Sequence, residues 1–323
     1  MTNKENYFVR RVVGCGASIL LSLHSLASAQ TVSTPVVGFQ KVTLPLGGAA
    51  FAPTFVKANT FTGPASISGS TVTTTSNALA GLSLGPTSFS DRANFPRYYA
   101  EVVNTNSPFC GYNFDITSLN NASSFQSANI PAGLTGTVTI AIRPHLTLAD
   151  LDPANMQDGD SVTIYNDPSG GASTYYQASG GWVDSNGNPG YAHVPVYPGT
   201  GVIYGGQSSA NTITLTGNVK NTPTAVPVYL GAVLNVVAPV NPSASVNYAN
   251  QNIANSIGDG ASFTKYTADG SLVEESTYYA ASGVLVDNNG NPASSVPIPG
   301  SQAVNVGSLS QDAVWIIPAA INP

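Results

Sequence analysis

Two segments of the chain, about 100 residues apart, carry nearly the same sequence, and this repeat is the strongest constraint on the fold. Residues 173–180 read STYYQASG and residues 276–283 read STYYAASG. Each is followed by a second matching segment, VDSNGNP at 183–189 and VDNNGNP at 286–292. A period this long indicates a duplicated domain rather than a solenoid. Because the repeated residues are turn formers and strand aromatics, they constrain architecture more than chemistry.

Short runs of alternating apolar and polar residues dominate the rest of the chain. Alternation with a period of two is typical of half-buried strands. Asn186-Gly187 and Asn289-Gly290 supply residues that are favoured in type I′ hairpin turns. Residues 314–317 (VWII) form a continuous apolar run, which predicts a strand buried on both faces. The alternating runs include 42–46, 138–142, 162–164, 213–215 and 226–230.

Helical spacing of apolar residues is confined to 147–151 and 246–257. The chain is therefore predicted to be all-β, with at most short helices. We expect three β-sandwich or barrel-like units, of which the last two are an internal duplication. The predicted units are an N-terminal β domain at 30–135, a first copy at 136–238 and a second copy at 239–323. The proline-rich seam between the copies is short, so we expect them to pack together.

Residues 1–29 have the features of a signal peptide for export. Three basic residues precede an apolar run at 12–26, and residues 27–29 read ASA, a small-x-small cleavage site. Less favoured alternatives are a lipoprotein signal ending at Cys15 and a twin-arginine signal at Arg10-Arg11. Beyond residue 30 no apolar run approaches the roughly 18 residues of a membrane helix. The sequence thus predicts an exported protein, periplasmic, at the cell surface or extracellular, without membrane insertion.

Only 8% of the residues are charged, against about 25% in ordinary soluble domains. Cleavage after residue 29 would remove three of the ten basic residues and one of the sixteen acids, leaving a net charge of about −8. A negative chain without a basic cluster is not expected to bind nucleic acids or anionic membranes. Hydrophobic residues make up 42% of the chain, enough for a core. This composition is typical of exported fibres, adhesins and matrix proteins.

Three segments carry a resemblance to a known family. They are 36–45 (VVGFQKVTLP), 142–148 (IRPHLTL) and, in the first copy, the order Tyr-Tyr, Trp182 and 198–201 (PGTG). In these segments the chain resembles an uncharacterised family of exported, β-rich proteins described mainly from verrucomicrobial bacteria. The resemblance extends over nearly the whole chain after residue 30, and it implies export and an all-β fold. It carries no implication of an enzyme activity and does not settle function. The second copy departs from the pattern, because Leu285 replaces Trp182 and the last glycine of PGTG is lost.

Motifs that would identify an enzyme are scarce. Beyond residue 29 the chain has two histidines, His145 and His193, and it lacks the H-E-x-x-H and C-x-x-C patterns. A triad of His193, Asp184 and a serine is a remote alternative. A glycosidase needs only two carboxylates. Adjacent carboxylates fall in predicted turns or caps, where acids accept backbone N–H groups, so we expect no enzyme activity and no cofactor. These pairs are Asp150/Asp152, Asp158/Asp160 and Glu274/Glu275.

Alternating oxygen-bearing side chains in the two repeated turns resemble the start of a calcium-binding loop. Neither turn has the glutamate that completes an EF-hand loop. A hairpin turn explains the same residues without a metal, and we favour that interpretation. The weak calcium candidates are Asp184, Asn186, Asn188, Asp287, Asn289 and Asn291.

Aromatic residues are concentrated at 175–204. Tyr175 and Tyr176 recur as Tyr278 and Tyr279, which predicts core or cross-strand pairs common to both copies. Four others have no aromatic counterpart; in particular, the alignment places Asn305 opposite Tyr204. These four could form an exposed platform that stacks on sugar rings, but a place in the core or between the copies is the favoured interpretation. The glycan-binding candidates are Trp182, Tyr191, Tyr197 and Tyr204.

The sequence therefore favours a non-enzymatic exported protein with a structural role at the cell surface or in a matrix. A glycan-binding module or adhesin is the alternative, and a polysaccharide-acting enzyme is a more distant one. The expected partners are a second copy of the chain (homo-oligomer) or an extracellular polysaccharide, and residues 31–46 could act as a donor strand. Cys110 is the one cysteine after residue 29. We expect it to be a buried thiol, with an intermolecular disulfide as the alternative.

Overall fold

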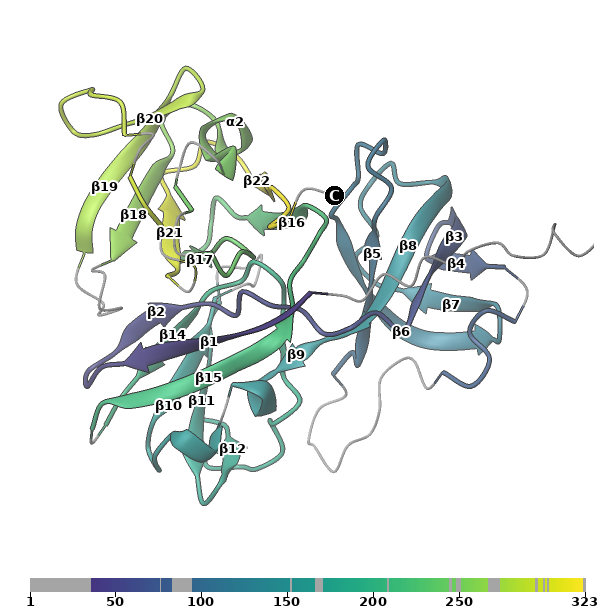
Figure 1. Cartoon of the computed structure of the whole chain (residues 1–323), viewed down its shortest axis with the longest axis horizontal. Coiled ribbons are helices and arrows are strands. Elements are labelled where there is room, and N and C mark those ends of the chain that lie inside the picture. Colours follow the sequence, from purple (N-terminus) through teal and green to yellow (C-terminus); the bar gives the residue numbers. More distant parts are fainter. Residues whose placement is uncertain are drawn as a thin grey trace, which may run out of the picture. The chain divides into compact units, whose positions relative to one another are not determined.

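The computed structural model describes residues 36–75, 77–82, 95–151, 153–165, 171–207, 209–243, 246–247, 251–266, 274–293, 296–298, 300 and 302–321. The predicted signal peptide lies outside these residues. Strands account for nearly all of the regular structure, so the all-β prediction is confirmed (Figure 1). The described helices are short: η1 (Leu148–Asp150), η2 (Pro153–Asn155) and α2 (Ile253–Ile257). Within the described part of the chain, no helix combines the length and the apolar character needed to cross a bilayer.

Six strands close into a barrel, drawn in blue in Figure 1. Its interior is filled by alternating apolar residues, such as Ala100 and Val102 on one strand and Ile140 and Ile142 on another. The strand order is β3-β4-β7-β6-β5-β8. The bounds are β3 (Phe61–Ser68), β4 (Thr71–Thr74), β5 (Tyr98–Val102), β6 (Asn113–Asn121), β7 (Ser124–Ser127) and β8 (Gly136–Pro144).

The first-copy segment builds a five-stranded sheet in the order β12-β11-β10-β14-β2. Two two-stranded ribbons, β1-β15 and β13-β9, accompany it, and one core cluster that includes Trp182 and Tyr204 joins residues of all three. The bounds are β1 (Val37–Leu44), β2 (Ala49–Phe51), β9 (Leu146–Thr147), β10 (Ser161–Ile164), β11 (Ser173–Ala178), β12 (Gly181–Val183), β13 (Pro195–Val196), β14 (Val202–Gly205) and β15 (Asn211–Asn218).

The second-copy segment contributes to another five-stranded sheet, in the order β17-β21-β18-β19-β20, and to the ribbon β16-β22. Trp315 is fully buried in its core and donates its indole N–H to the Gln251 carbonyl (2.6 Å). The bounds are β16 (Thr224–Val228), β17 (Asn235–Val237), β18 (Ser262–Tyr266), β19 (Glu274–Ala281), β20 (Val284–Val286), β21 (Val304–Gly307) and β22 (Ala313–Ile317).

The same four-stranded arrangement occurs in both copies. β10 lies between β11 and β14 as β18 lies between β19 and β21, and the registers Val162↔Tyr175 and Phe263↔Tyr278 correspond. The tight hairpins use Ser-Gly: Ser179 and Ser282 have φ values of 50° and 53°, and the glycines after them both have 79°. Two successive residues with positive φ are the type I′ pattern. The predicted Asn-Gly hairpins are wrong in this detail, because Asn186 and Asn289 are not among the residues with positive φ.

Strand pairing crosses the predicted boundaries in three places. β8 begins at Gly136, the predicted start of the first copy, yet it completes the barrel. β1 and β2, from the predicted N-terminal domain, pair with β15 and β14 of the first copy. β16 and β17, from the first copy, pair with β22 and β21 of the second, respectively. These partners are far apart in sequence, so local patterns do not encode them. Residues 37–44 of the proposed donor segment are thus paired within their own chain.

The terminal strand β22 differs from its prediction. Trp315 and Ile317 are buried, but Val314 and Ile316 are only half-buried. Because β22 belongs to a two-stranded ribbon, one face packs on the core and the other is left partly open.

Candidate functional site

The outer face of the barrel carries a group of buried polar side chains. Along β5, Ala100 and Val102 point into the barrel core, so Tyr99 and Glu101 point outward. Asp115 on β6 lies between the inward Phe114 and Ile116 and shares this outer face. These side chains are nevertheless buried, because loops from the rest of the chain cover them.

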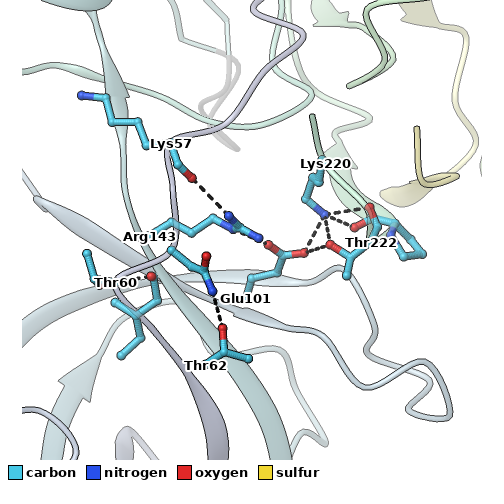
Figure 2. Close-up of polar contacts among 10 residues, drawn as sticks. Lys57, Thr60, Thr62, Glu101, Arg143, Lys220 and Thr222 are labelled. Atoms are coloured by element: carbon cyan, nitrogen blue, oxygen red, sulfur yellow. Dashed lines mark hydrogen bonds and ion pairs between the residues drawn. The ribbon is translucent and has the colours of Figure 1, made fainter. Parts of the chain in front are cut away.

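Glu101, Arg143, Lys220 and Thr222 form what we call the ionic cluster (Figure 2). The Glu101 carboxylate is bound through both oxygens: Oε2 lies 3.2 Å from Arg143 Nε, and Oε1 lies 2.6 Å from Lys220 Nζ. The Thr222 hydroxyl donates to the same Oε1. Arg143 also donates to the Lys57 carbonyl (3.1 Å). The cluster therefore joins two barrel strands to the segment before β3 and to the segment after β15.

Lys220 is buried completely, with a side-chain exposure of 0%. Its ammonium donates to the Thr222 carbonyl (3.0 Å), to the Thr222 hydroxyl (2.8 Å) and to the Pro223 carbonyl. Gly111 makes this close approach feasible: its φ is +90°, and a Cβ there would lie 2.6 Å from the Pro223 oxygen. A side chain at this position would push the 222–224 segment away from the barrel.

Opposing effects set the charge states in the ionic cluster. Burial by itself would raise the pKa of Glu101, but the Lys220 and Arg143 charges and the hydrogen bonds from Lys220 and Thr222 hold it below its usual value. Burial lowers the pKa of Lys220, and the neighbouring Glu101 carboxylate opposes that effect. Each charge is thus tolerated because of the other. Removing one partner from a buried pair typically costs about 3–5 kcal/mol, because the remaining charge is left uncompensated.

A second group, the tyrosine–histidine cluster, comprises Tyr99, Asp115, His145 and Tyr197. His145 Nε2 lies 3.0 Å from Asp115 Oδ1, and the Tyr197 hydroxyl donates to Asp115 Oδ2 at 2.6 Å. The His145 ring centroid lies 4.9 Å from those of Tyr99 and of Tyr197. Burial, followed by the Asp115 charge, raises the pKa of Tyr197. This cluster joins the barrel to the segment after β13.

The predicted glycan-binding aromatics do not gather on one exposed face. Trp182 is 2% exposed and donates its indole N–H to the Leu148 carbonyl (3.1 Å). Tyr204 is 0% exposed and donates to Asp160 Oδ2 (2.8 Å). Tyr191 is half-buried, with its ring 5.3 Å from that of Tyr175. Trp182 and Tyr204 therefore offer no ring face to a sugar, and Tyr197 belongs to the tyrosine–histidine cluster.

The calcium candidates close two equivalent turns by hydrogen bonds. Asp184 Oδ1 accepts from the backbone N–H groups of Asn186 and Asn188, and Oδ2 accepts from the Asn188 amide, all at 2.9 Å. The Asn188 side chain and these N–H groups lower the pKa of Asp184 to about 2. Asp287 makes the same contacts with Asn289 and Asn291, and its pKa is also lowered. Among the described residues, no three His, Cys, Asp or Glu side chains are placed to share a metal ion.

The remaining acids named from the sequence take part in local structure. Asp158 accepts from the Ser179 N–H (2.8 Å), and Asp150 accepts from the Thr147 N–H and pairs with Lys57 (both 2.8 Å). Asp160 is buried and accepts from two backbone N–H groups, the Tyr204 hydroxyl and the Asn211 amide. Asp152 and the side chains of Glu274 and Glu275 lie outside the described residues.

Cys110 is half-buried, so the prediction of a buried thiol is wrong. The predicted strand around it is a turn, and β6 begins only at Asn113. Burial still raises the pKa of the thiol, and the Lys220 charge opposes this effect.

The sequence singled out Tyr197 as a glycan candidate and His145 as one of two histidines, but it did not predict that the other residues of the two clusters come together. One signal was available: Glu101 sits in a strand that reads YYAEV, in a chain with only 8% charged residues. A lone charge within an apolar strand needs a buried partner, but the sequence does not say which one.

Comparisons with protein-family models, with curated proteins and with solved structures find no match to this chain. The family resemblance of the sequence therefore stays a prediction.

Proposed function

We propose that this chain is an exported, non-enzymatic structural protein of the cell surface or extracellular matrix. The observation that carries the proposal is the ionic cluster. Glu101, Arg143 and Lys220 are all buried in a chain with few charges. Their charged groups contact one another and nearby backbone carbonyls, across elements that are distant in sequence.

A cluster of this kind fixes the arrangement of the segments that contribute to it, and this suits a structural role better than a catalytic one. A buried ion pair contributes little net stability compared with apolar packing, but each partner can be accommodated only in the arrangement that supplies the other. The tyrosine–histidine cluster adds a second polar tie between the barrel and the segment after β13. Two ties of this kind hold the barrel in one orientation, which suits a protein that transmits or resists force.

Export rests on the sequence pattern of residues 1–29, and self-association rests on β1. This strand pairs with β15 in a two-stranded ribbon, and its outward side chains Val37 and Phe39 are 70% and 71% exposed. An apolar strand at the end of a sheet is a surface on which a second copy of the chain can add.

Light scattering of the purified protein over a wide concentration range tests the proposal. We expect mass to rise with concentration in the wild type and to rise less in Phe39→Ser. Thr43→Ser, a change on the same exposed face, is the matched control and should behave like the wild type. A strict monomer at high concentration, or polysaccharide turnover that disappears when buried carboxylates are replaced, would refute a structural role.

A further inference from the structure

A cavity of about 400 Å³ lies beside the tyrosine–histidine cluster, between the start of β6 and the ribbon β16-β22. Its lining includes the tyrosines Tyr112, Tyr197 and Tyr229 and the amides Asn113 and Asn129. Cavities of this size hold small molecules or a few rings of a larger one. Tyr197 is the one residue that this cavity shares with the aromatics singled out from the sequence.

The chemistry of the lining selects for an uncharged ligand. Among the residues that the structure describes, those around the cavity include no Lys, Arg, Asp, Glu or His. Binding an ion here would leave its charge without a partner, which is strongly unfavourable away from water. Tyrosine rings give apolar faces, and tyrosine hydroxyls and amides give donors and acceptors.

Tyr197 is held in place before any ligand arrives. Its hydroxyl donates to Asp115 Oδ2 at 2.6 Å, and its ring meets that of His145 edge to face at an interplanar angle of 76°. The ring is only half-buried, so part of its surface remains accessible. An aromatic side chain fixed in this way loses little conformational freedom on binding.

Asn113 supplies the most specific indication. Its Oδ1 atom is buried and has no hydrogen-bond partner among the described residues. A buried acceptor without a donor is unfavourable, and a rotation of the amide that turned Oδ1 from its buried position toward the cavity would let a ligand hydroxyl relieve it. Sugars are rich in hydroxyl donors. A polyproline segment, the other common partner of tyrosine-lined grooves, has no N–H to give at its prolines.

We propose that this cavity binds a neutral saccharide, as one or two rings of an extracellular polysaccharide. The rings of Tyr197 and Tyr229 pack against the apolar faces of the sugar, and the amides of Asn113 and Asn129 bond to its hydroxyls. Binding goes beyond the structural role and needs neither catalysis nor self-association.

The test is calorimetric titration of the purified protein with neutral cello-, laminari- and manno-oligosaccharides at millimolar concentrations. We expect at least one to bind. We expect Tyr229→Ala to weaken it by roughly threefold to tenfold, the usual range for one aromatic contact. Asn113→Ala should weaken binding without lowering the melting temperature, because it removes an unpaired acceptor. Tyr279→Ala, a half-exposed tyrosine outside the cavity, is the control and should bind like the wild type.

Three results would overturn the inference. They are no binding by any of the oligosaccharides, equal affinity of the wild type and a folded Tyr229→Ala variant, or binding of a proline-rich peptide in place of the saccharides. None of them bears on the light-scattering test, so the structural role and the saccharide site stand or fall separately.

Discussion

The two copies of the four-stranded motif have the same backbone arrangement but different interiors. Trp182 pairs with Gln177 at the point where Leu285 pairs with Ala280. Asp160 and Ala261 are also equivalent, because their carbonyls accept from the N–H groups of Gln177 and Ala280, respectively. The first copy thus places a carboxylate and an indole where the second copy has a methyl group and a leucine.

Pairing also corrects one detail of the alignment. In the first copy, Tyr204 lies opposite Val162. In the second copy, Phe263 is the counterpart of Val162, and it lies opposite Val306. Val306, rather than Asn305, therefore takes the place of Tyr204. The donor and the acceptor of the Tyr204–Asp160 hydrogen bond have both been replaced by apolar residues in the second copy.

The turns, in contrast, are the same in both copies. Asp158 and Asp259 each accept from the serine N–H of the hairpin, at 2.8 and 2.7 Å. Asp184 and Asp287 close the next turn with equivalent bonds from the two asparagines, and Asp184 also accepts from the Tyr191 hydroxyl at 3.2 Å. The two copies thus share their turn residues and their strand order, while the interior is filled with polar groups in one copy and with apolar groups in the other. Polar truncations should accordingly be more damaging in and around the first copy.

The largest loss of stability is expected in the ionic cluster, to which the first-copy segment contributes Lys220. Lys220→Ala leaves the buried Glu101 with Arg143 as its remaining cation, and we expect a loss of about 3–5 kcal/mol in the free energy of unfolding. Urea denaturation followed by tryptophan fluorescence measures it. Lys41→Ala, at an exposed position on β1, is the matched control and should change stability by less than about 0.5 kcal/mol. Similar values for the two variants would contradict a structural role for the cluster.

Asp160→Ala converts the first interior toward the second and tests the comparison directly. Four donors then lose their acceptor: the N–H groups of Gln157 and Gln207, the Tyr204 hydroxyl and the Asn211 amide. We expect a loss of about 3 kcal/mol, since the buried Tyr204 hydroxyl is left without its acceptor and several partly buried bonds are lost at the same time.

The double variant Asp160→Ala/Tyr204→Val reproduces both second-copy residues and provides the control. The Tyr204→Val change removes the Tyr204 hydroxyl, one of the donors that Asp160→Ala leaves unpaired. The loss of unfolding free energy in the double variant, measured by the same denaturation experiments, should therefore be smaller than the sum of the losses in the two single variants. Strict additivity would show that the two side chains do not act as a pair.

Trp182→Leu places the second-copy residue in the first core. The change removes a buried ring and the hydrogen bond to the Leu148 carbonyl, so we expect a loss of about 2–4 kcal/mol in thermal unfolding experiments. Leu285→Ile, a volume-conserving change at the equivalent position, should cost less than about 1.5 kcal/mol. A fully stable Trp182→Leu variant would mean that the two cores are interchangeable.

The sequence predicted what is local and missed what is distant. Alternation identified the runs of β8, β10, β15 and β16 correctly, and helical spacing located η1 and α2. Pairing of β1 with β15 and of β16 with β22 joins segments separated by more than 80 residues, and no local pattern specifies it. The ionic cluster has the same origin: Glu101 and Lys220 are far apart in the sequence, and their contact exists only in the folded chain.

A smaller difference in stability is expected when the glycines of the two Ser-Gly hairpins are replaced by alanine. Gly180 and Gly283 have the same φ of +79°, but an added Cβ meets nothing within 4 Å at Gly180 and lies 2.8 Å from Asn255 Oδ1 at Gly283. Gly180→Ala should lose about 1–2 kcal/mol from the left-handed conformation alone, and Gly283→Ala should lose more. Asn255→Ala/Gly283→Ala removes the obstructing side chain and should bring the second hairpin back to the value of the first. Equal losses for the two single variants would show that Asn255 moves aside freely.

The smallest effect is expected at acidic pH, where the aspartates of the two equivalent turns should both titrate below the usual value. The bonds to Asn188 and Asn291 lower the pKa values of Asp184 and Asp287, with Asp184 at about 2. A carboxyl whose pKa is lower in the folded state stabilises the turn above its unfolded pKa of about 3.9, and this contribution is lost as the pH falls through the folded value. Carbon-detected NMR titration of the carboxyl groups should therefore find both midpoints below 3.9, and Asn188→Ala should raise that of Asp184 while leaving that of Asp287 in place. An ordinary midpoint for either carboxyl in the wild type would mean that its turn is open in solution, and calcium could then be tested at that turn.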